Sequence, residues 1–348
     1  MLERYAECPY RVFLERGLGL EERPVYGPTK ADSGTLIHDA LWHFSENVKK
    51  SGQTFRLISD EDAARLMDET IDKLLKEEGT EIYRANERYA YQAYRLKSML
   101  SHMVEIIRKQ LKAGRFEPEE FEKEFAFRSE NMDLHGKIDR VDMCREDGLN
   151  YVKIIDYKSG NTEFSYEKLY EGLLLQLPVY MKELIRENEE KNIPSAMFYS
   201  KTDDPFVDDS KDTEQKRLAA LKPSGVILDD YTMIPYLDNG FFANDSYTSD
   251  IVPLKKKDGL YEGTLSDTEF RKILTFAEEK METEAKEILA GNIRRRPVNR
   301  GNQIKSCTYC DFRELCKDFG SDPHEKLRSI PKLTKTEFFE KIDGKEES

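Results

Sequence analysis

The stretch that decides the fold is residues 133–160, with the sequence DLHGKIDRVDMCREDGLNYVKIIDYKSG. Asp147-Gly148 separates two apolar runs, a pattern typical of a β-hairpin with a two-residue turn. We therefore predict two antiparallel strands joined at residues 146–148. Because side chains alternate between the faces of a strand, Asp156 and Lys158 should point the same way.

The predicted hairpin brings Asp139, Asp156 and Lys158 together at one end. The face that carries Asp156 is otherwise apolar, and uncompensated charge is unfavourable there. A divalent cation would compensate the two carboxylates, and Mg²⁺ held by few oxygen ligands keeps bound waters. Such an ion polarises a phosphoryl oxygen and acidifies a water, which Lys158 could orient. The alternative is that these charges form ordinary surface ion pairs.

The two strands resemble the core of the RecB-type PD-(D/E)XK nucleases, in which a G-x-I-D-R strand precedes an I-D-Y-K-S/T-G strand. Residues 136–140 and 155–160 match these motifs. The resemblance implies a restriction-endonuclease-like α/β fold, with a mixed central sheet flanked by helices. It also implies Mg²⁺- or Mn²⁺-dependent hydrolysis of DNA, with Asp139, Asp156 and the Tyr157 carbonyl as metal ligands and Lys158 positioning the attacking water.

Composition limits the class of protein. Charged residues make up 35% of the 348 residues, and the mean hydropathy is −0.72. No apolar run approaches the roughly 18 residues of a membrane span, and the charged N-terminus lacks a signal-peptide core. We therefore expect a soluble, cytoplasmic protein. The net charge of −13 argues against a general nucleic-acid coat protein.

A nuclease of this charge needs local basic patches. Arg294, Arg295 and Arg296 lie in an acid-free stretch from residue 291 to 310, and residues 255–257 are three lysines. Either patch could contact phosphates. A solvated loop is the alternative for both, and we favour it for the lysines.

A helix opening at Gly34 carries His38, which shares a face with Leu41 and Trp42. A lone histidine on an apolar face is ordinarily a packed core residue. RecB-type nucleases, however, carry a G-x-x-x-H helix whose histidine reaches the metal, and residues 34–38 match this pattern. With the hairpin present, we expect His38 to be a metal ligand or to lie beside the metal.

Apolar periodicity predicts the remaining elements. Helices are expected at residues 2–17, 60–78, 86–113, 166–188 and 266–289, and further strands at 121–127 and 194–201. Asp60 is the expected cap of its helix, and Pro178 should kink the helix that contains it. Glu124 shares a strand face with Glu122 and could supply an acidic ligand, although a structural role is the better interpretation.

Gln176 and Tyr180 are one helical turn apart and lie one above the other. They resemble the Q-x-x-x-Y motif on the helix after the lysine strand in RecB-type nucleases, which implies contact with DNA or support of the site. A buried glutamine on a helix face is the alternative.

Three cysteines cluster near the end of the chain in a C-x2-C-x5-C pattern: Cys307, Cys310 and Cys316. Cys8, followed by proline, lies near the opposite end, and Cys144 is expected to be an unligated strand residue. Four thiolates suit an iron–sulfur cluster or structural zinc, and the spacing together with the following resemblance favours iron–sulfur. If Cys8 joins these three, the set resembles the four-cysteine 4Fe–4S staple of the AddAB-type B subunit and of Cas4-type nucleases, which would tie the two ends together.

The resemblance covers nearly the whole chain and implies the C-terminal nuclease domain of an AddAB-type helicase–nuclease B subunit. We expect a helical segment (1–115), a catalytic core (116–202), an insertion (203–265), a C-terminal helix with the cysteine cluster (266–320) and a peripheral polar tail (321–348). No G-x-x-x-x-G-K-[S/T] loop occurs, so the implied ATPase is the partner A subunit. A longer chain upstream of Met1 is expected.

The implied function is a DNA exonuclease that hydrolyses single-stranded DNA emerging from the motor during double-strand-break repair. The alternatives are an autonomous Cas4-like iron–sulfur nuclease and a catalytically silent DNA-binding scaffold. The insertion and the length of the chain argue against the first alternative. Intact Asp139, Asp156 and Lys158 argue against the second.

Overall fold

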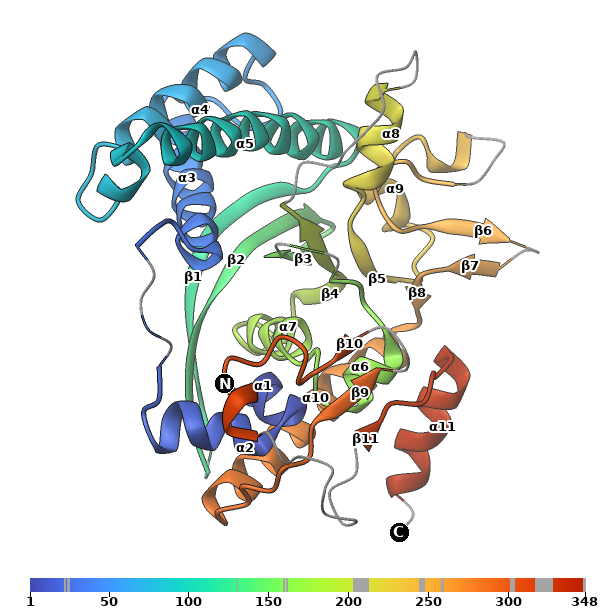
Figure 1. Ribbon diagram of the computed structural model, residues 1–348. Helices are drawn as coiled ribbons and strands as arrows, with labels where there is room; N and C mark the ends of the chain where they lie inside the picture. The colour runs from blue at the N-terminus through green and yellow to red at the C-terminus, as the bar shows by residue number, and fades with distance from the viewer. Residues whose placement is uncertain are drawn as a thin grey trace.

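The computed structural model has a six-stranded sheet at its centre, with strand order β1-β2-β3-β4-β5-β8 (Figure 1). The described residues are 1–21, 23, 26–129, 131–158, 160, 162–202, 213–243, 248–257, 260–300, 304–316 and 328–346. The strands of the sheet are β1 Glu117–Arg128, β2 Asp133–Glu146, β3 Leu149–Lys158, β4 Asn192–Lys201, β5 Ser224–Leu228 and β8 Thr264–Leu265. β2 pairs antiparallel with β1 and β3, whereas β3 and β4 are parallel. The predicted mixed sheet is therefore confirmed.

The hairpin of β2 and β3 forms where the sequence predicts it. Asp147 and Gly148 have φ values of 50° and 80°, as a two-residue hairpin turn requires, and Glu146 pairs with Leu149. The register runs from this turn to Arg140 opposite Ile155. The next residues along the two strands, Asp139 and Asp156, therefore lie next to each other.

Helices cover the sheet on two sides. Figure 1 shows α3, α4 and α5 on one side and α6, α7 and α10 on the other. Their bounds are α3 Lys30–Lys50, α4 Asp60–Leu74, α5 Glu87–Ala113, α6 Tyr166–Tyr170, α7 Gln176–Arg186 and α10 Asp267–Leu289. Apolar side chains from both sides join the sheet in one main core, which includes Leu41 and Phe44 of α3, Met67 of α4, Met181 of α7 and Phe270 of α10.

Capping residues set the helix starts. α3 begins at Lys30, ahead of the predicted start at Gly34, because Thr29 and Asp32 form a capping box. Ser59 caps α4 by accepting a hydrogen bond from the Asp62 amide, so the prediction of Asp60 as the cap is wrong. Ser266 caps α10.

Two predicted helices are broken. The first divides into α1 Leu2–Glu7, α2 Pro9–Val12 and a π-helical turn Phe13–Gly17, because Cys8, the residue before a proline, is extended. The helix predicted for 166–188 breaks at Gly172, which has φ +81°, and resumes at Gln176. Pro178 consequently lies in the first turn of α7, where it is tolerated, and the predicted kink is wrong.

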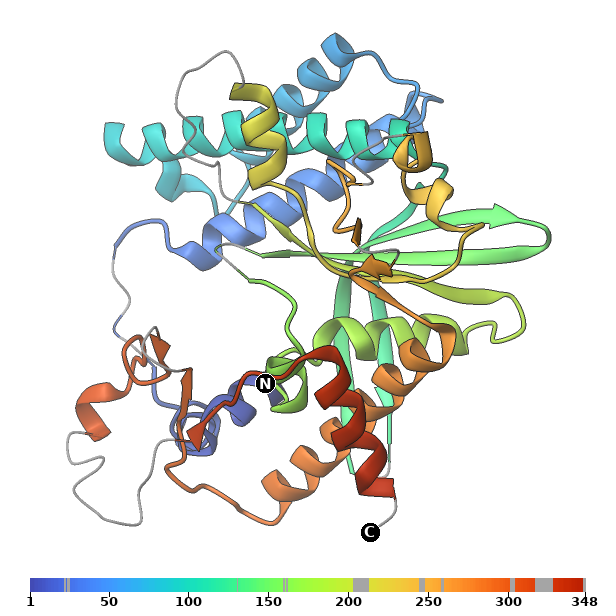
Figure 2. The same cartoon turned by 90° about the vertical axis from the view of Figure 1, so that its right-hand side faces the viewer.

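The two ends of the chain lie together beneath the sheet. α1 packs on α10, and the small sheet of β9 Val298–Arg300, β10 Ile304–Lys305 and β11 Arg328–Ser329 lies beside α1 and α2 (Figure 2). α11 Lys335–Glu346 packs on α6 and buries Phe338 completely. The expectation of a peripheral tail is therefore wrong for this helix.

The segment predicted as an insertion contributes to the central sheet through β5 and β8. It also holds α8 Thr213–Ala220, α9 Ile234–Leu237, β6 Lys255–Lys257 and β7 Leu260–Glu262. Parts of this segment (203–212, 244–247 and 258–259) and of the predicted tail (321–327 and 347–348) lie outside the described residues. Within the described part of the chain, no helix has the length and apolar character needed to cross a bilayer.

Candidate active site and metal centre

His38, Glu122 and Asp139 form a group that could hold a metal ion. One potential ligand atom from each lies within 4.8 Å of the other two. His38 Nδ1 is 2.8 Å from Glu122 Oε1 and 3.4 Å from Asp139 Oδ1. The carboxylate oxygens suit Mg²⁺ or Mn²⁺, and the imidazole nitrogen is a ligand typical of transition metals, so these residues fit a divalent cation.

Three different elements supply this group. His38 comes from α3, and Glu122 lies opposite Asp139 because Phe121 pairs with Arg140 and Lys123 with Ile138. Glu122 has φ +52°, a conformation that is uncommon for residues other than glycine. The sequence had suggested Glu124 as a candidate ligand, but that residue is exposed and lies outside the group.

Asp156 and Lys158 adjoin this group from β3. Lys158 Nζ is 2.7 Å from Asp156 Oδ2, and Asp156 is 2% exposed. The Tyr157 amide donates a 2.6 Å hydrogen bond to Asp139 Oδ2, which ties β3 to β2 at the site. The predicted proximity of Asp139, Asp156, Lys158 and His38 is thus present in the structure.

A residue of α7 contacts the lysine of this site. Lys158 Nζ donates a 2.8 Å hydrogen bond to Gln176 Oε1, and Gln176 Nε2 donates one of 3.0 Å to Tyr180 Oη. Gln176 and Tyr180 are therefore in contact, as their spacing predicts, and Gln176 also contacts Lys158. A role of either residue in DNA contact stays a prediction.

Burial and like charge alter the acidity of the two aspartates. Burial, and then the neighbouring Asp156 carboxylate, raises the pKa of Asp139 to about 7. Burial also raises the pKa of Asp156, although Lys158 opposes this shift. For His38, burial lowers the pKa, but the hydrogen bond to Glu122 and the charge of Asp139 outweigh it and raise the pKa overall. A bound cation would relieve the repulsion between these carboxylates.

The sequence of the chain matches a known protein family. The sequence profile described as the PD-(D/E)XK nuclease superfamily matches residues 1–317. The chain belongs to the PD-(D/E)XK nuclease superfamily. The family prediction made from the hairpin motifs is confirmed.

Several curated relatives of this PD-(D/E)XK chain are named as the B subunit of an ATP-dependent helicase/deoxyribonuclease. The protein from Lachnoclostridium phytofermentans is 32% identical over 361 residues, which cover 99% of this chain and 31% of that protein. The one from Clostridioides difficile is 30% identical, covering 99% and 32% respectively. The one from Clostridium botulinum (Loch Maree) is 31% identical, covering 91% and 29%. The chain therefore spans about a third of the length of these relatives.

Among the described residues, two that belong to or support this candidate site escaped the sequence prediction. One is Glu122, described above. The other is Glu3 of α1, whose Oε1 accepts hydrogen bonds of 2.8 and 2.9 Å from the backbone amides of Leu175 and Gln176. Glu3 thereby satisfies free amides at the start of α7, the helix whose Gln176 contacts Lys158. A lone acidic residue in the first turn of a helix gives no signal of this distant contact.

The opposite face of the hairpin carries a buried charge cluster. Asp142 accepts hydrogen bonds of 2.6 Å from both Arg140 Nε and Arg140 Nη2, and Lys153 Nζ is 2.9 Å from Asp142 Oδ2. All three side chains are buried. Arg140 Nη1 also donates a 3.3 Å hydrogen bond to Tyr157 Oη, and the Tyr157 ring meets the His38 ring edge-on, with the ring centroids 6.3 Å apart. Coordination by the Tyr157 carbonyl stays a prediction.

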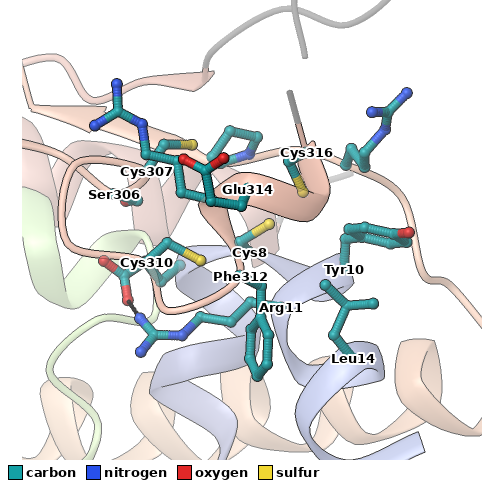
Figure 3. Close-up of a pocket in the computed structure, with 14 residues that line it drawn as sticks. Cys8, Tyr10, Arg11, Leu14, Ser306, Cys307, Cys310, Phe312, Glu314 and Cys316 are labelled. Carbon is teal, nitrogen blue, oxygen red and sulfur yellow. Dashed lines mark hydrogen bonds and ion pairs between the residues drawn. The ribbon is translucent and has the colours of Figure 1, made fainter. Parts of the chain in front are cut away.

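The four predicted cluster cysteines line one cavity of about 380 Å³. Cys8 comes from the break between α1 and α2, whereas Cys307, Cys310 and Cys316 follow β10 (Figure 3). Burial, and then the Cys8 thiol, raises the pKa of Cys307 to about 11. In the described part of the chain, no three cysteine sulfurs form a group like that of His38, Glu122 and Asp139, whose potential ligand atoms all lie within 4.8 Å of one another. Cys144 is buried in β2.

The predicted basic patch lies near the cysteines. Arg295 lines their cavity, with its guanidinium 6.0 Å from the centre of the Tyr10 ring, and Arg294 and Arg296 are exposed. Among described residues, none of these arginines lines the pocket that contains His38 and Lys158. Their contact with DNA phosphates stays a prediction.

Proposed function

We propose that this chain is the divalent-metal-dependent deoxyribonuclease unit of a double-strand-break-processing helicase–nuclease. It hydrolyses phosphodiester bonds of single-stranded DNA delivered by an ATP-driven A subunit. The observation that carries this proposal is the meeting of His38, Glu122 and Asp139 beside the Asp156–Lys158 pair. The names of the relatives, which combine a helicase with a deoxyribonuclease, support the substrate and the partner.

Each group has a distinct task in this proposal. His38, Glu122, Asp139 and Asp156 would hold the cation, together with the predicted Tyr157 carbonyl. When bound, Mg²⁺ or Mn²⁺ supplies Lewis acidity toward a phosphoryl oxygen and lowers the pKa of a water. Lys158 hydrogen-bonds the attacking water or a phosphate oxygen, and Asp156 and Gln176 fix its ammonium in place.

Further residues are proposed to hold the substrate. Gln176 and Tyr180 would support or contact the strand at the site, and Arg294, Arg295 and Arg296, of which Arg294 and Arg296 are exposed, would contact phosphates away from it. Because the chain as a whole carries a net charge of −13, binding of DNA phosphates needs such local positive charge.

Metal removal tests the catalytic proposal. The chain should degrade a single-stranded oligonucleotide in Mg²⁺. Excess EDTA should stop the reaction, because it removes the cation that the carboxylates hold and that stabilises the charge on the phosphate. The measurement is a gel assay of labelled DNA, with and without a helicase–nuclease A subunit. Degradation that continues unchanged in EDTA would contradict metal dependence, and binding without degradation in any metal would favour a silent scaffold.

We also propose that Cys8, Cys307, Cys310 and Cys316 hold a 4Fe–4S cluster that staples the two ends of the domain. The shared cavity supports this, since each thiolate of a four-iron cluster binds a different iron and the sulfurs surround the cluster (Figure 3). A ligated metal also favours the thiolate form, which burial otherwise disfavours at Cys307.

Cys8→Ala should remove the brown chromophore and lower the melting temperature, because the cluster loses the one ligand that comes from the N-terminal end. Visible absorption, iron content and a thermal melt measure the effect. Cys144→Ala is the matched control, since Cys144 is buried in β2 and its loss should leave the chromophore intact. Protein purified without oxygen that contains zinc and no iron would refute the cluster.

A further inference from the structure

A groove between α3 and α5 continues from the candidate active site. The pocket around His38 and Lys158 has a volume of about 300 Å³, and a neighbouring pocket has about 560 Å³. The two share four lining residues: Lys30, Gly34, Ile37 and Thr202. α3 contacts α5, and Figure 2 shows the two helices on the same side of the sheet. We call the larger pocket the α3–α5 groove.

Two cations line the α3–α5 groove, Lys30 from α3 and Arg95 from α5. Both are exposed, and neither has an ion-pair partner among the described residues. Many other cations of this acidic chain are paired, for example Arg65 with Asp62 and Arg128 with Asp133. An uncompensated pair of cations beside the active site favours an anionic ligand such as a DNA phosphate.

Gly34 lies at the junction of the two pockets, inside α3. Glycine is less favourable than alanine in a helix. Here the backbone does not need a positive φ, and a Cβ added at Gly34 would meet no atom within 4 Å. Neither conformation nor packing within the described chain requires a glycine. A ligand that passes close to the helix backbone would require a glycine there, because any side chain would block its approach.

Exposed aromatic rings lie beside this wall of the groove. Tyr91 and Tyr94 of α5 are 62% and 67% exposed, and their rings stack with centroids 6.3 Å apart. Tyr91 lies one helical turn before Arg95, so the two side chains are neighbours on the helix surface. Aromatic rings next to cations are the pattern by which proteins hold single-stranded nucleic acid.

We infer that the α3–α5 groove binds the single strand next to the scissile phosphate. Flanking phosphates contact Lys30 and Arg95, the sugar–phosphate backbone passes over Gly34, and bases extend toward Tyr91. This inference rests on the proposed nuclease function, and it adds the direction in which the strand leaves the metal group. The groove is built from residues outside the catalytic constellation.

The charge of the groove is tested with the Lys30→Ala/Arg95→Ala double variant of the 348-residue chain. Binding of a fluorescent oligothymidylate is measured by anisotropy in Ca²⁺ over a range of salt concentrations. Loss of two phosphate contacts should lower the salt slope by about 1.4 and weaken binding roughly 25-fold at 0.1 M salt. Lys50→Ala/Lys73→Ala is the control, because it removes two exposed lysines at the far end of α3 and on α4.

The glycine is tested separately. Gly34→Ala should leave the melting temperature unchanged or raise it, since alanine favours the helix, while DNA affinity and cleavage fall severalfold. A purely structural glycine would give the opposite result, a lower melting temperature with unchanged DNA affinity.

The outcomes separate this inference from the proposed function. If the wild-type chain cleaves DNA but the double variant binds and cleaves like the Lys50/Lys73 control, the groove is rejected and the nuclease stands. If the wild type binds DNA through the groove, with the expected loss in the double variant, but never cleaves, the nuclease is rejected and the groove stands. If the wild type binds no single-stranded DNA, both are rejected.

Discussion

Replacing Asp139 or Asp156 by asparagine should lower cleavage of single-stranded DNA by at least roughly a thousandfold, which corresponds to about 4 kcal/mol of transition-state stabilisation. Asparagine keeps the size of the side chain, and at position 139 its carbonyl can still accept the hydrogen bond from the Tyr157 amide. What it removes is the negative charge that a divalent cation needs. Cleavage is measured on gels, and DNA affinity, which should change little, by anisotropy.

Two glutamates on β1 provide a matched comparison for this result. Glu122→Gln should reduce cleavage, because Glu122 lies in the group with His38 and Asp139. Glu124→Gln should not, because Glu124 lies outside that group on the exposed surface of the same strand. Full cleavage by both aspartate variants would reject the assigned site, and equal loss in both glutamate variants would reject the role of Glu122.

The parts of the site that the sequence predicted depend on short-range signals. The Asp147-Gly148 turn sets the register of the hairpin, and the register places Asp139 beside Asp156. Strand alternation then puts Lys158 on the same face as Asp156. In the structure, Lys158 Nζ lies 2.7 Å from Asp156 Oδ2. The contact of His38 needed more than periodicity, because only the family motif distinguished it from a core histidine.

The parts that the sequence missed depend on long-range placement. Glu122 and Glu124 are equivalent by strand alternation, and the choice between them follows from how α3 lies across β1. Glu3 reaches the start of α7 across more than 170 residues of chain, which no local pattern encodes. The break between α6 and α7 was missed because helical periodicity continues through Gly172, although its positive φ ends the helix.

The largest expected loss of stability comes from Asp142, on the face of the hairpin opposite the metal group. Asp142→Ala should lower the free energy of unfolding by about 3–5 kcal/mol, because it leaves the buried cations of Arg140 and Lys153 without their counter-ion. Burial alone would raise the pKa of Asp142, but these two cations hold it below its usual value. Denaturant unfolding measures the change.

An exposed pair in the same hairpin region provides the control for Asp142. Asp133→Ala removes the partner of Arg128, whose side chain is 81% exposed, and should change the free energy of unfolding little, because solvent screens an exposed ion pair. An Asp142→Ala loss as small as that of Asp133→Ala would show that the buried cluster is not held by its charges.

A variant that replaces the whole cluster separates stability from positioning. Arg140→Met/Asp142→Leu/Lys153→Met removes all three charges together, and apolar replacement of a buried ion cluster is often close to neutral for stability. This variant also removes the hydrogen bond from Arg140 to the Tyr157 hydroxyl, while Tyr157 donates its amide to Asp139. We therefore expect near-normal unfolding with cleavage reduced severalfold. Unchanged cleavage would mean that the cluster stabilises the hairpin without orienting the residues of the metal group.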